Sequence, residues 1–104
     1  SRHHWLVVYS GRPVGEVVAN SKSGEVGVVI GEKSLWGKGV GKLAVLKMIE
    51  VLLADSTFEI RPINAVIHPK NFRSQRLFSN LGFTRTGKPA RNGQEEWVWS
   101  GKFP

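Results

Sequence analysis

The stretch Trp36–Gly41 places three glycines on alternate positions around a lysine, and a second lysine follows it directly. Glycine allows a positive φ angle and lets a ligand approach the main chain without meeting a Cβ atom. A long apolar segment, Val40–Ala54, follows, so the glycines lead into the free amides of a helix N-terminus. Those amides and the helix dipole favour a phosphate or a diphosphate. The sequence therefore predicts an anion site here, with Lys38 and Lys42 beside it.

Two familiar phosphate loops do not fit this stretch. A dinucleotide-binding loop needs a glycine three residues after Gly39, where the chain has Lys42. A nucleoside-triphosphate loop needs serine or threonine after the lysine, where the chain has Leu43. The glycines can also serve a tight strand-to-helix turn and nothing else, so spacing alone leaves both interpretations open.

The elements that must position this loop begin with three β-prone segments, Trp5–Tyr9, Val14–Ala19 and Glu25–Ile30. Short breaks of turn-forming residues separate them, which favours an antiparallel meander. Segment Val40–Ala54 is apolar around most of its circumference and contains few charges. This pattern predicts a helix that is buried on most sides.

A short apolar strand, Ile63–Ile67, is expected after this helix. Asn71 can cap a second helix that reaches about Leu81, and Gly82 is its stop signal. An N-cap residue at this place fixes where the second helix starts.

The last part of the chain predicts a β-hairpin. Segments Phe83–Lys88 and Glu95–Lys102 read as strands, and the loop between them contains Asn92-Gly93, a hairpin turn signal. The whole order is β-β-β-α-β-α-β-β. It indicates an α/β fold with a mixed, mostly antiparallel sheet and two main helices, in a single domain over residues 1–104.

The composition fits one globular domain with a basic surface. The chain has 15 Lys and Arg against 8 Asp and Glu among its 104 residues, a formal net charge of +7. Without cysteine, it has no disulfides, thiolate metal sites or cysteine nucleophiles. No apolar run approaches the roughly 20 residues of a membrane span, and no signal-peptide pattern opens the sequence, so a cytoplasmic protein is expected. The charge predicts an anionic partner but fits a nucleic acid, a small phosphorylated ligand or a merely solvated surface.

The glycine loop resembles motif A of the GNAT N-acetyltransferases, which reads Gln/Arg-x-x-Gly-x-Gly/Ala. Gly39 and Gly41 match the motif's glycines, and Trp36 takes the place of the Gln or Arg, as is common in the ribosomal-protein and spermidine acetyltransferase branch. A second stretch, Asn71–Phe83, is similar to the family's Asn-x-x-Ser/Ala … Leu-Gly-Phe element. The resemblance runs from about Trp5 to the C-terminus and implies the acyl-CoA N-acyltransferase fold.

The resemblance implies acetyl-CoA as co-substrate, with no metal. In the family, the coenzyme lies between two parallel strands that part, here Glu25–Ile30 and Ile63–Ile67. The residues that the resemblance assigns to coenzyme binding are Val29, Ile30, Gly31 and Asn71 for the pantetheine arm, Gly37, Lys38, Gly39, Val40, Gly41 and Lys42 for the diphosphate, and Arg73 and Arg76 for the 3′-phosphate.

Acetyl transfer requires a base for the amine and a proton for the leaving thiolate. Glu25 is the candidate base, because it lies eleven residues before Trp36, where the histone acetyltransferase branch carries its glutamate. Family members often carry a tyrosine acid seven residues after the capping asparagine, but this position is Phe78, which has no proton to donate. Ser74, one turn earlier, is expected to assist the thiolate, and His68 could relay a proton. Each of the three polar residues also has a plain interpretation as a solvated surface group.

The family normally opens with a strand and two helices, whereas four residues precede Trp5 here. The resemblance therefore implies a module of a longer protein, or a partner chain that supplies this wall. An uncovered sheet edge also favours a homodimer.

Three functions follow from these features. The first is N-acetylation of an amine by direct attack in a ternary complex, with no indication of which amine. The second is a CoA-binding module without turnover. The third is a small basic nucleic-acid binder, which requires basic and aromatic residues on one exposed sheet face. Trp97 and Trp99 are expected to pack under a helix instead.

Overall fold

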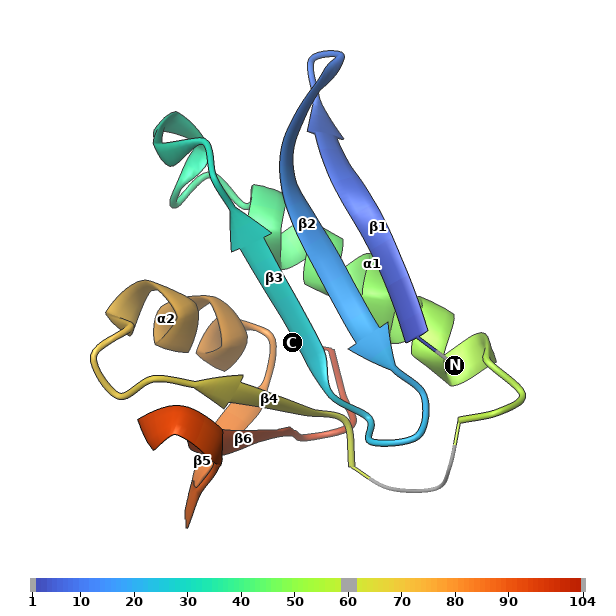
Figure 1. Ribbon diagram of the computed structural model, residues 1–104, viewed down its shortest axis with the longest axis vertical. Coiled ribbons are helices and arrows are strands. Elements are labelled where there is room, and N and C mark those ends of the chain that lie inside the picture. Colours follow the sequence, from blue (N-terminus) through green and yellow to red (C-terminus); the bar gives the residue numbers. More distant parts are fainter. Residues whose placement is uncertain (1, 59–61, 104) are drawn as a thin grey trace.

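The computed structural model describes residues 2–58 and 62–103, and its elements follow the expected order (Figure 1). The α/β fold with two main helices is therefore confirmed, with two short 3-10 helices added. The first strand starts earlier than expected and the last one ends earlier. The elements are β1 (Arg2–Tyr9), β2 (Arg12–Asn20), β3 (Val26–Ile30), η1 (Lys33–Leu35), α1 (Val40–Ala54), β4 (Asn64–Ile67), α2 (Phe72–Asn80), β5 (Phe83–Pro89), η2 (Arg91–Gly93) and β6 (Glu95–Trp99).

The strands form two three-stranded sheets rather than one continuous sheet. The first has the order β1-β2-β3 and is the expected antiparallel meander. The second has the order β4-β6-β5 and is also antiparallel. Its hairpin turns at Asn92 and Gly93, whose φ angles of 56° and 74° match the turn signal in the sequence.

Helix α1 packs against one face of the first sheet, over β2 and β3 (Figure 1). Its buried side chains join those of the sheet in one core, and each such burial stabilises by roughly 1.5–3 kcal/mol. The helix is less buried than its composition predicts, because Leu43 and Leu53 are 57% and 55% exposed. The sheet covers only one side of α1. Neither α1 nor any other helix within the described ranges is long and apolar enough to cross a membrane.

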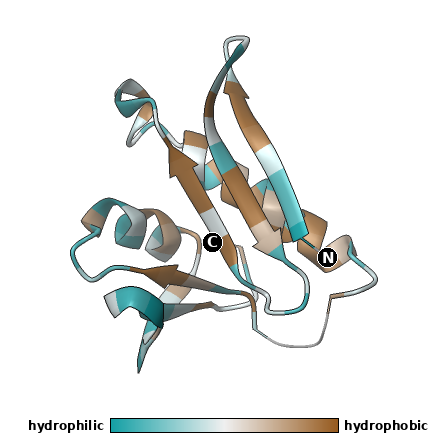
Figure 2. Ribbon diagram, viewed as in Figure 1, coloured by the Kyte–Doolittle hydropathy of each residue, from teal (hydrophilic) through white to brown (hydrophobic). Residues whose placement is uncertain are grey.

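Helix α2 packs against the second sheet through aromatic contacts. The rings of Phe78 and Phe83 meet edge to face, with centroids 5.0 Å apart. Trp97 is buried, and Trp99 Nε1 donates to Leu81 O at 3.0 Å. Both tryptophans thus pack within the part of the molecule formed by α2 and the second sheet, as expected. They do not form the exposed aromatic face that nucleic-acid binding requires. Figure 2 shows brown, hydrophobic segments along β3 and β4 and a hydrophilic η2.

Candidate functional site

Helix α1 begins with main-chain amides that have no acceptor among residues 2–58 and 62–103. Its N-cap residue, Gly39, has a φ of 83°, and no side-chain hydrogen bond caps this end within the described part of the chain. Leu43 N donates to Gly39 O at 3.0 Å. The amides of Val40, Gly41 and Lys42, which precede this bond, have no acceptor within the helix. The helix start is therefore free to hold an anion.

The space around the glycine loop is open. A Cβ atom at Gly37 or at Gly39 would have no heavy atom within 4 Å, and both residues have positive φ angles. Lys38 is exposed and Lys42 is half-buried, so two cations flank the accessible main chain. An anionic ligand can reach these amides without displacing a side chain.

The third glycine of the loop has a packing role. A Cβ atom at Gly41 would lie 2.8 Å from Leu77 Cδ1, so the missing side chain lets α1 approach α2 closely. Gly41 is buried, in contrast to Gly37 and Gly39. The two interpretations of the glycines therefore apply to different residues. Gly37 and Gly39 leave room for a ligand, whereas Gly41 serves the packing of the two helices.

Strands β3 and β4 run parallel and meet at one point only. A single parallel bridge joins Glu25 and Asn64, and Asn64 N donates to Gly24 O at 2.9 Å. Beyond this bridge β3 pairs with β2, and β4 pairs with β6. Along the described residues no ladder joins β3 to β4, so the strands part as the resemblance implied (Figure 1).

The register of the meander decides which groups of β3 face this gap. Gly31 N donates to Val14 O at 2.8 Å, so the odd-numbered residues of β3 exchange hydrogen bonds with β2. Val29 therefore directs its main-chain groups, and Gly31 its amide, away from the gap, in contrast to the expectation from sequence. Val28 and Ile30 present their main-chain groups to the gap instead.

Trp36 connects the two sides of the gap at its open end. Its Nε1 donates to Ile30 O at 2.8 Å, and the guanidinium carbon of Arg73 lies 3.3 Å from the centre of its ring. Because Ile30 ends β3 and Arg73 belongs to α2, the indole bridges the two halves of the molecule. Lys33 Nζ lies 5.7 Å from the ring centre. Arg76 is exposed on α2.

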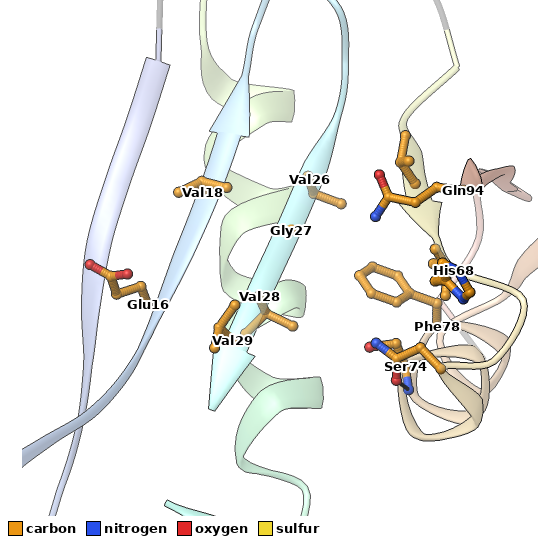
Figure 3. Close-up of a pocket in the computed structure, with 13 residues that line it drawn as sticks. Glu16, Val18, Val26, Gly27, Val28, Val29, His68, Ser74, Phe78 and Gln94 are labelled. Atoms are coloured by element: carbon orange, nitrogen blue, oxygen red, sulfur yellow. Dashed lines mark hydrogen bonds between the residues drawn. The ribbon is translucent and has the colours of Figure 1, made fainter. Parts of the chain in front are cut away.

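A hollow of about 310 Å³ lies where the strands part, between β3 and the second sheet. Figure 3 shows the ring of Phe78 pointing toward β3, with Gln94 on one side of it and Ser74 on the other. The polar residues that line the hollow come from four elements or their ends: Glu16, His68, Asn71, Ser74 and Gln94.

Of the predicted site residues, Val29, Asn71 and Ser74 line this hollow together. Asn71 Oδ1 accepts from Ser74 N at 3.1 Å, so Asn71 caps α2 as expected. Asn71 Nδ2 remains as the donor that this side chain can offer to a ligand.

Glu25 is placed apart from them, at the closed end of the gap. Its two carboxylate oxygens accept from Arg91 Nη1 at 3.0 Å and Nη2 at 2.5 Å. This contact raises the pKa of Arg91, mainly through the hydrogen bond from the guanidinium to the carboxylate. Glu25 does not line the hollow. The structure therefore does not bring the two predicted catalytic residues, Glu25 and Ser74, to one cavity.

Glu16 and Gln94 line the hollow but were not predicted as site residues. Glu16 lies on β2, where its Oε1 is 3.0 Å from His4 Nε2 on β1. Gln94 enters from the hairpin between β5 and β6. Strand alternation could have indicated the sheet face on which Glu16 lies. No local pattern indicates Gln94, because its place depends on the pairing of β6 with β4.

Comparison with known proteins gives the same family as the motifs. A family model described as an acetyltransferase (GNAT) domain matches residues 2–84. An uncharacterized protein from Methanocaldococcus jannaschii is 35% identical over 91 residues, which cover 85% of this chain and 18% of that protein.

Solved structures share the fold. A domain from Methanocaldococcus jannaschii superposes with a TM-score of 0.76 at 29% identity, covering 93% of this chain and 65% of that chain. The aminoglycoside acetyltransferase AAC(6')-Ib, solved with coenzyme A, has a TM-score of 0.78 at 22% identity, covering 94% and 65%. A spermidine N-acetyltransferase chimera from Vibrio cholerae has a TM-score of 0.67 at 17% identity, covering 93% and 65%. The chain thus spans about two thirds of these solved chains and about a fifth of the curated relative.

Proposed function

Because the chain belongs to the GNAT acetyltransferase family, we propose that it forms a domain that binds acetyl-CoA and transfers the acetyl group to an amine. The observation that carries this proposal is the open start of α1 beside two strands that part after one bridge. The solved acetyltransferase with bound coenzyme A shares this fold, which supports the same class of ligand here.

The residues present fit the three chemical parts of the coenzyme. The amides of Val40, Gly41 and Lys42, with the side chains of Lys38 and Lys42, suit a diphosphate because they combine main-chain donors with positive charge. The amide of Lys38 itself donates to Leu35 O at 3.2 Å. The free edge of β3 at Val28 suits a peptide-like arm, which can pair with it as an added strand. Asn71 Nδ2 would donate to the same arm. Arg73 and Arg76 on α2 offer cations for the remaining phosphate.

The parted strands place a small set of side chains where the acyl group would lie. Bound acetyl-CoA would supply a thioester, from which the amine takes the acetyl group while the electron pair of the carbon–sulfur bond stays on sulfur. We assign Ser74 a hydrogen bond to this end of the ligand, because it lines the hollow and Phe78 offers no hydroxyl. Glu25 can accept a proton from an amine only after it leaves Arg91, since both its oxygens accept from that guanidinium.

A second candidate is a domain that binds the coenzyme without turnover. Two observations favour it: Phe78 stands where family members often have a tyrosine, and Arg91 holds the carboxylate of Glu25. Mass spectrometry of reactions with spermidine, an aminoglycoside and a peptide N-terminus separates the two. An acetylated amine supports transfer, whereas binding without any acetylated product supports the second candidate.

Titration calorimetry of the chain with acetyl-CoA tests the proposal itself. We expect saturable binding with a dissociation constant below about 100 μM, which corresponds to about 5.5 kcal/mol. The absence of binding at that concentration would contradict both candidates, because each requires the open helix start to hold the coenzyme.

The face of the first sheet that lies opposite α1 supports a proposal about the oligomeric state of the chain. Leu6, Glu16 and Val29 are register neighbours on this face, and Leu6 and Val29 are 62% and 67% exposed. Exposed apolar side chains such as Leu6 and Val29, here on either side of the charged Glu16, are typical of a contact surface. We propose that a second copy of the chain covers it. Sedimentation velocity over a concentration series should show a dimer, and a monomer throughout would exclude this arrangement.

A further inference from the structure

His68 follows the last residue of β4, and its main chain and ring are both held by hydrogen bonds from the next turn of the chain. Its carbonyl oxygen accepts from Asn71 N at 2.9 Å and from Gln75 Nε2 at 3.3 Å. Gln75 Nε2 also donates to Pro69 O at 2.8 Å. These bonds fix the main chain of His68, whose exposed side chain lines the hollow.

The same loop determines which ring nitrogen carries the proton. Lys70 N donates to His68 Nδ1 at 3.1 Å, so Nδ1 acts as an acceptor. A neutral imidazole with an acceptor at Nδ1 carries its hydrogen on Nε2. Nε2 has no hydrogen-bond partner among the residues of the described ranges, which leaves one free N–H donor on a side chain that lines the hollow.

We propose that His68, through Nε2–H, stabilises the negative charge that develops on the sulfur of a thioester held in this hollow. This inference rests on the proposed binding of acetyl-CoA. A neutral imidazole with a fixed tautomer can donate a hydrogen bond to developing negative charge without giving up its proton. His68 is thus a hydrogen-bond donor to the leaving group rather than the proton relay that the sequence suggested.

The hollow combines apolar walls with polar side chains. Val18, Val26, Val28 and Phe78 supply apolar walls, and His68 lies beside them with its side chain exposed to solvent. Ser74 lines the same cavity, so its hydroxyl is a second donor there, whereas Phe78 contributes only an apolar ring.

The thiol of bound CoA reports this interaction directly. Thiolate absorbance in the ultraviolet gives the pKa of the CoA thiol in its complex with the chain, and a nearby donor lowers it. We expect this pKa to lie about one pH unit lower with the wild-type chain than with His68→Ala. His68→Gln, which keeps an N–H donor, should give an intermediate value. An equal thiol pKa in the wild-type chain and in His68→Ala would overturn the proposal, although CoA still binds.

Absence of CoA binding by the wild-type chain would have a different meaning, because it would overturn the proposed function and this inference together.

Nitrogen-15 NMR of the histidine rings gives a check that needs no ligand. His68 should show a protonated Nε2 and an unprotonated Nδ1 in its neutral form. Lys70→Ala keeps the main-chain donor and should show the same tautomer. The opposite tautomer would contradict the assignment.

Discussion

Helices α1 and α2 both begin with main-chain amides that have no acceptor within the helix, but a side chain accepts from such an amide at α2 and none does so at α1. At α2, Asn71 Oδ1 accepts from Ser74 N at 3.1 Å. At α1 the corresponding position is Gly39, which has no side chain to offer. A capping side chain stabilises a helix start by about 1 kcal/mol. Of the two α-helices in the described ranges, α1 is the one without a capping side chain, and it opens beside the parted strands, where an external anion can take the place of a cap.

The two ends of α1 differ in the same way. At its C-terminus, Asp55 accepts from Thr57 Oγ1 at 2.6 Å and lies 2.7 Å from His3 Nε2. Side chains of the chain itself therefore form hydrogen bonds at this end of the helix, and the contact with His3 links it to β1. One helix therefore has an end held by the chain's own side chains and an uncapped end, where we propose that the ligand binds.

The largest effect is expected from putting a carboxylate into the open start. Gly39→Asp places a negative charge beside the amides and should weaken acetyl-CoA binding by about two orders of magnitude or more. Titration calorimetry measures it. Gly11→Asp is the matched control, because Gly11 has a φ of 75° and equally open surroundings in the turn between β1 and β2. Equal affinities for the two variants would show that the loop does not hold the diphosphate.

Removing the cap of α2 should have a smaller effect, on stability. Asn71→Ala leaves Ser74 N without its acceptor and should lower the free energy of unfolding by about 1 kcal/mol. Urea unfolding followed by circular dichroism measures this change. Asn71→Ser, which keeps a capping oxygen, should recover most of it. If Asn71→Ala unfolds at the wild-type urea concentration, the contrast between the two helix starts has no energetic basis.

The closed end of α1 predicts a dependence of stability on pH. Hydrogen bonds from Thr57, and then from His3, hold the pKa of Asp55 well below its usual range. A lowered pKa in the folded state means that this stabilisation is present above the unfolded pKa of about 3.9 and is lost as the pH falls below it. Asp55→Asn should therefore lower the urea midpoint at pH 7 and reduce the difference between pH 7 and pH 3. An unchanged midpoint at pH 7 would contradict a stabilising role for the Asp55 contacts.

Features set by neighbouring residues could be predicted from the sequence. The turn at Gly37 and Gly39, the cap at Asn71 and the hairpin at Asn92 each depend on local backbone preferences, and the structure has all of them. The motif spacing also indicated the parted strands, through the resemblance to a family.

Features set by distant pairing could not be predicted. Glu25 is engaged by Arg91, which is 66 positions away in the sequence and reaches it only because the hairpin folds beside the bridge to β4. The orientation of Val29 depends on the register of β3 against β2, and a shift of one residue would reverse it. The exposure of Leu43 likewise depends on the fact that the sheet covers only one side of α1.

The central claim is that the amides at the start of α1 hold the coenzyme. Amide chemical shifts in a nitrogen-15-labelled chain, recorded while CoA is added, test it residue by residue. The account predicts that the amides of Val40, Gly41 and Lys42 shift strongly and saturate together, while Ser74 N, already bonded to Asn71, shifts less. Saturable CoA binding that leaves the amides of residues 37–42 unmoved would contradict it.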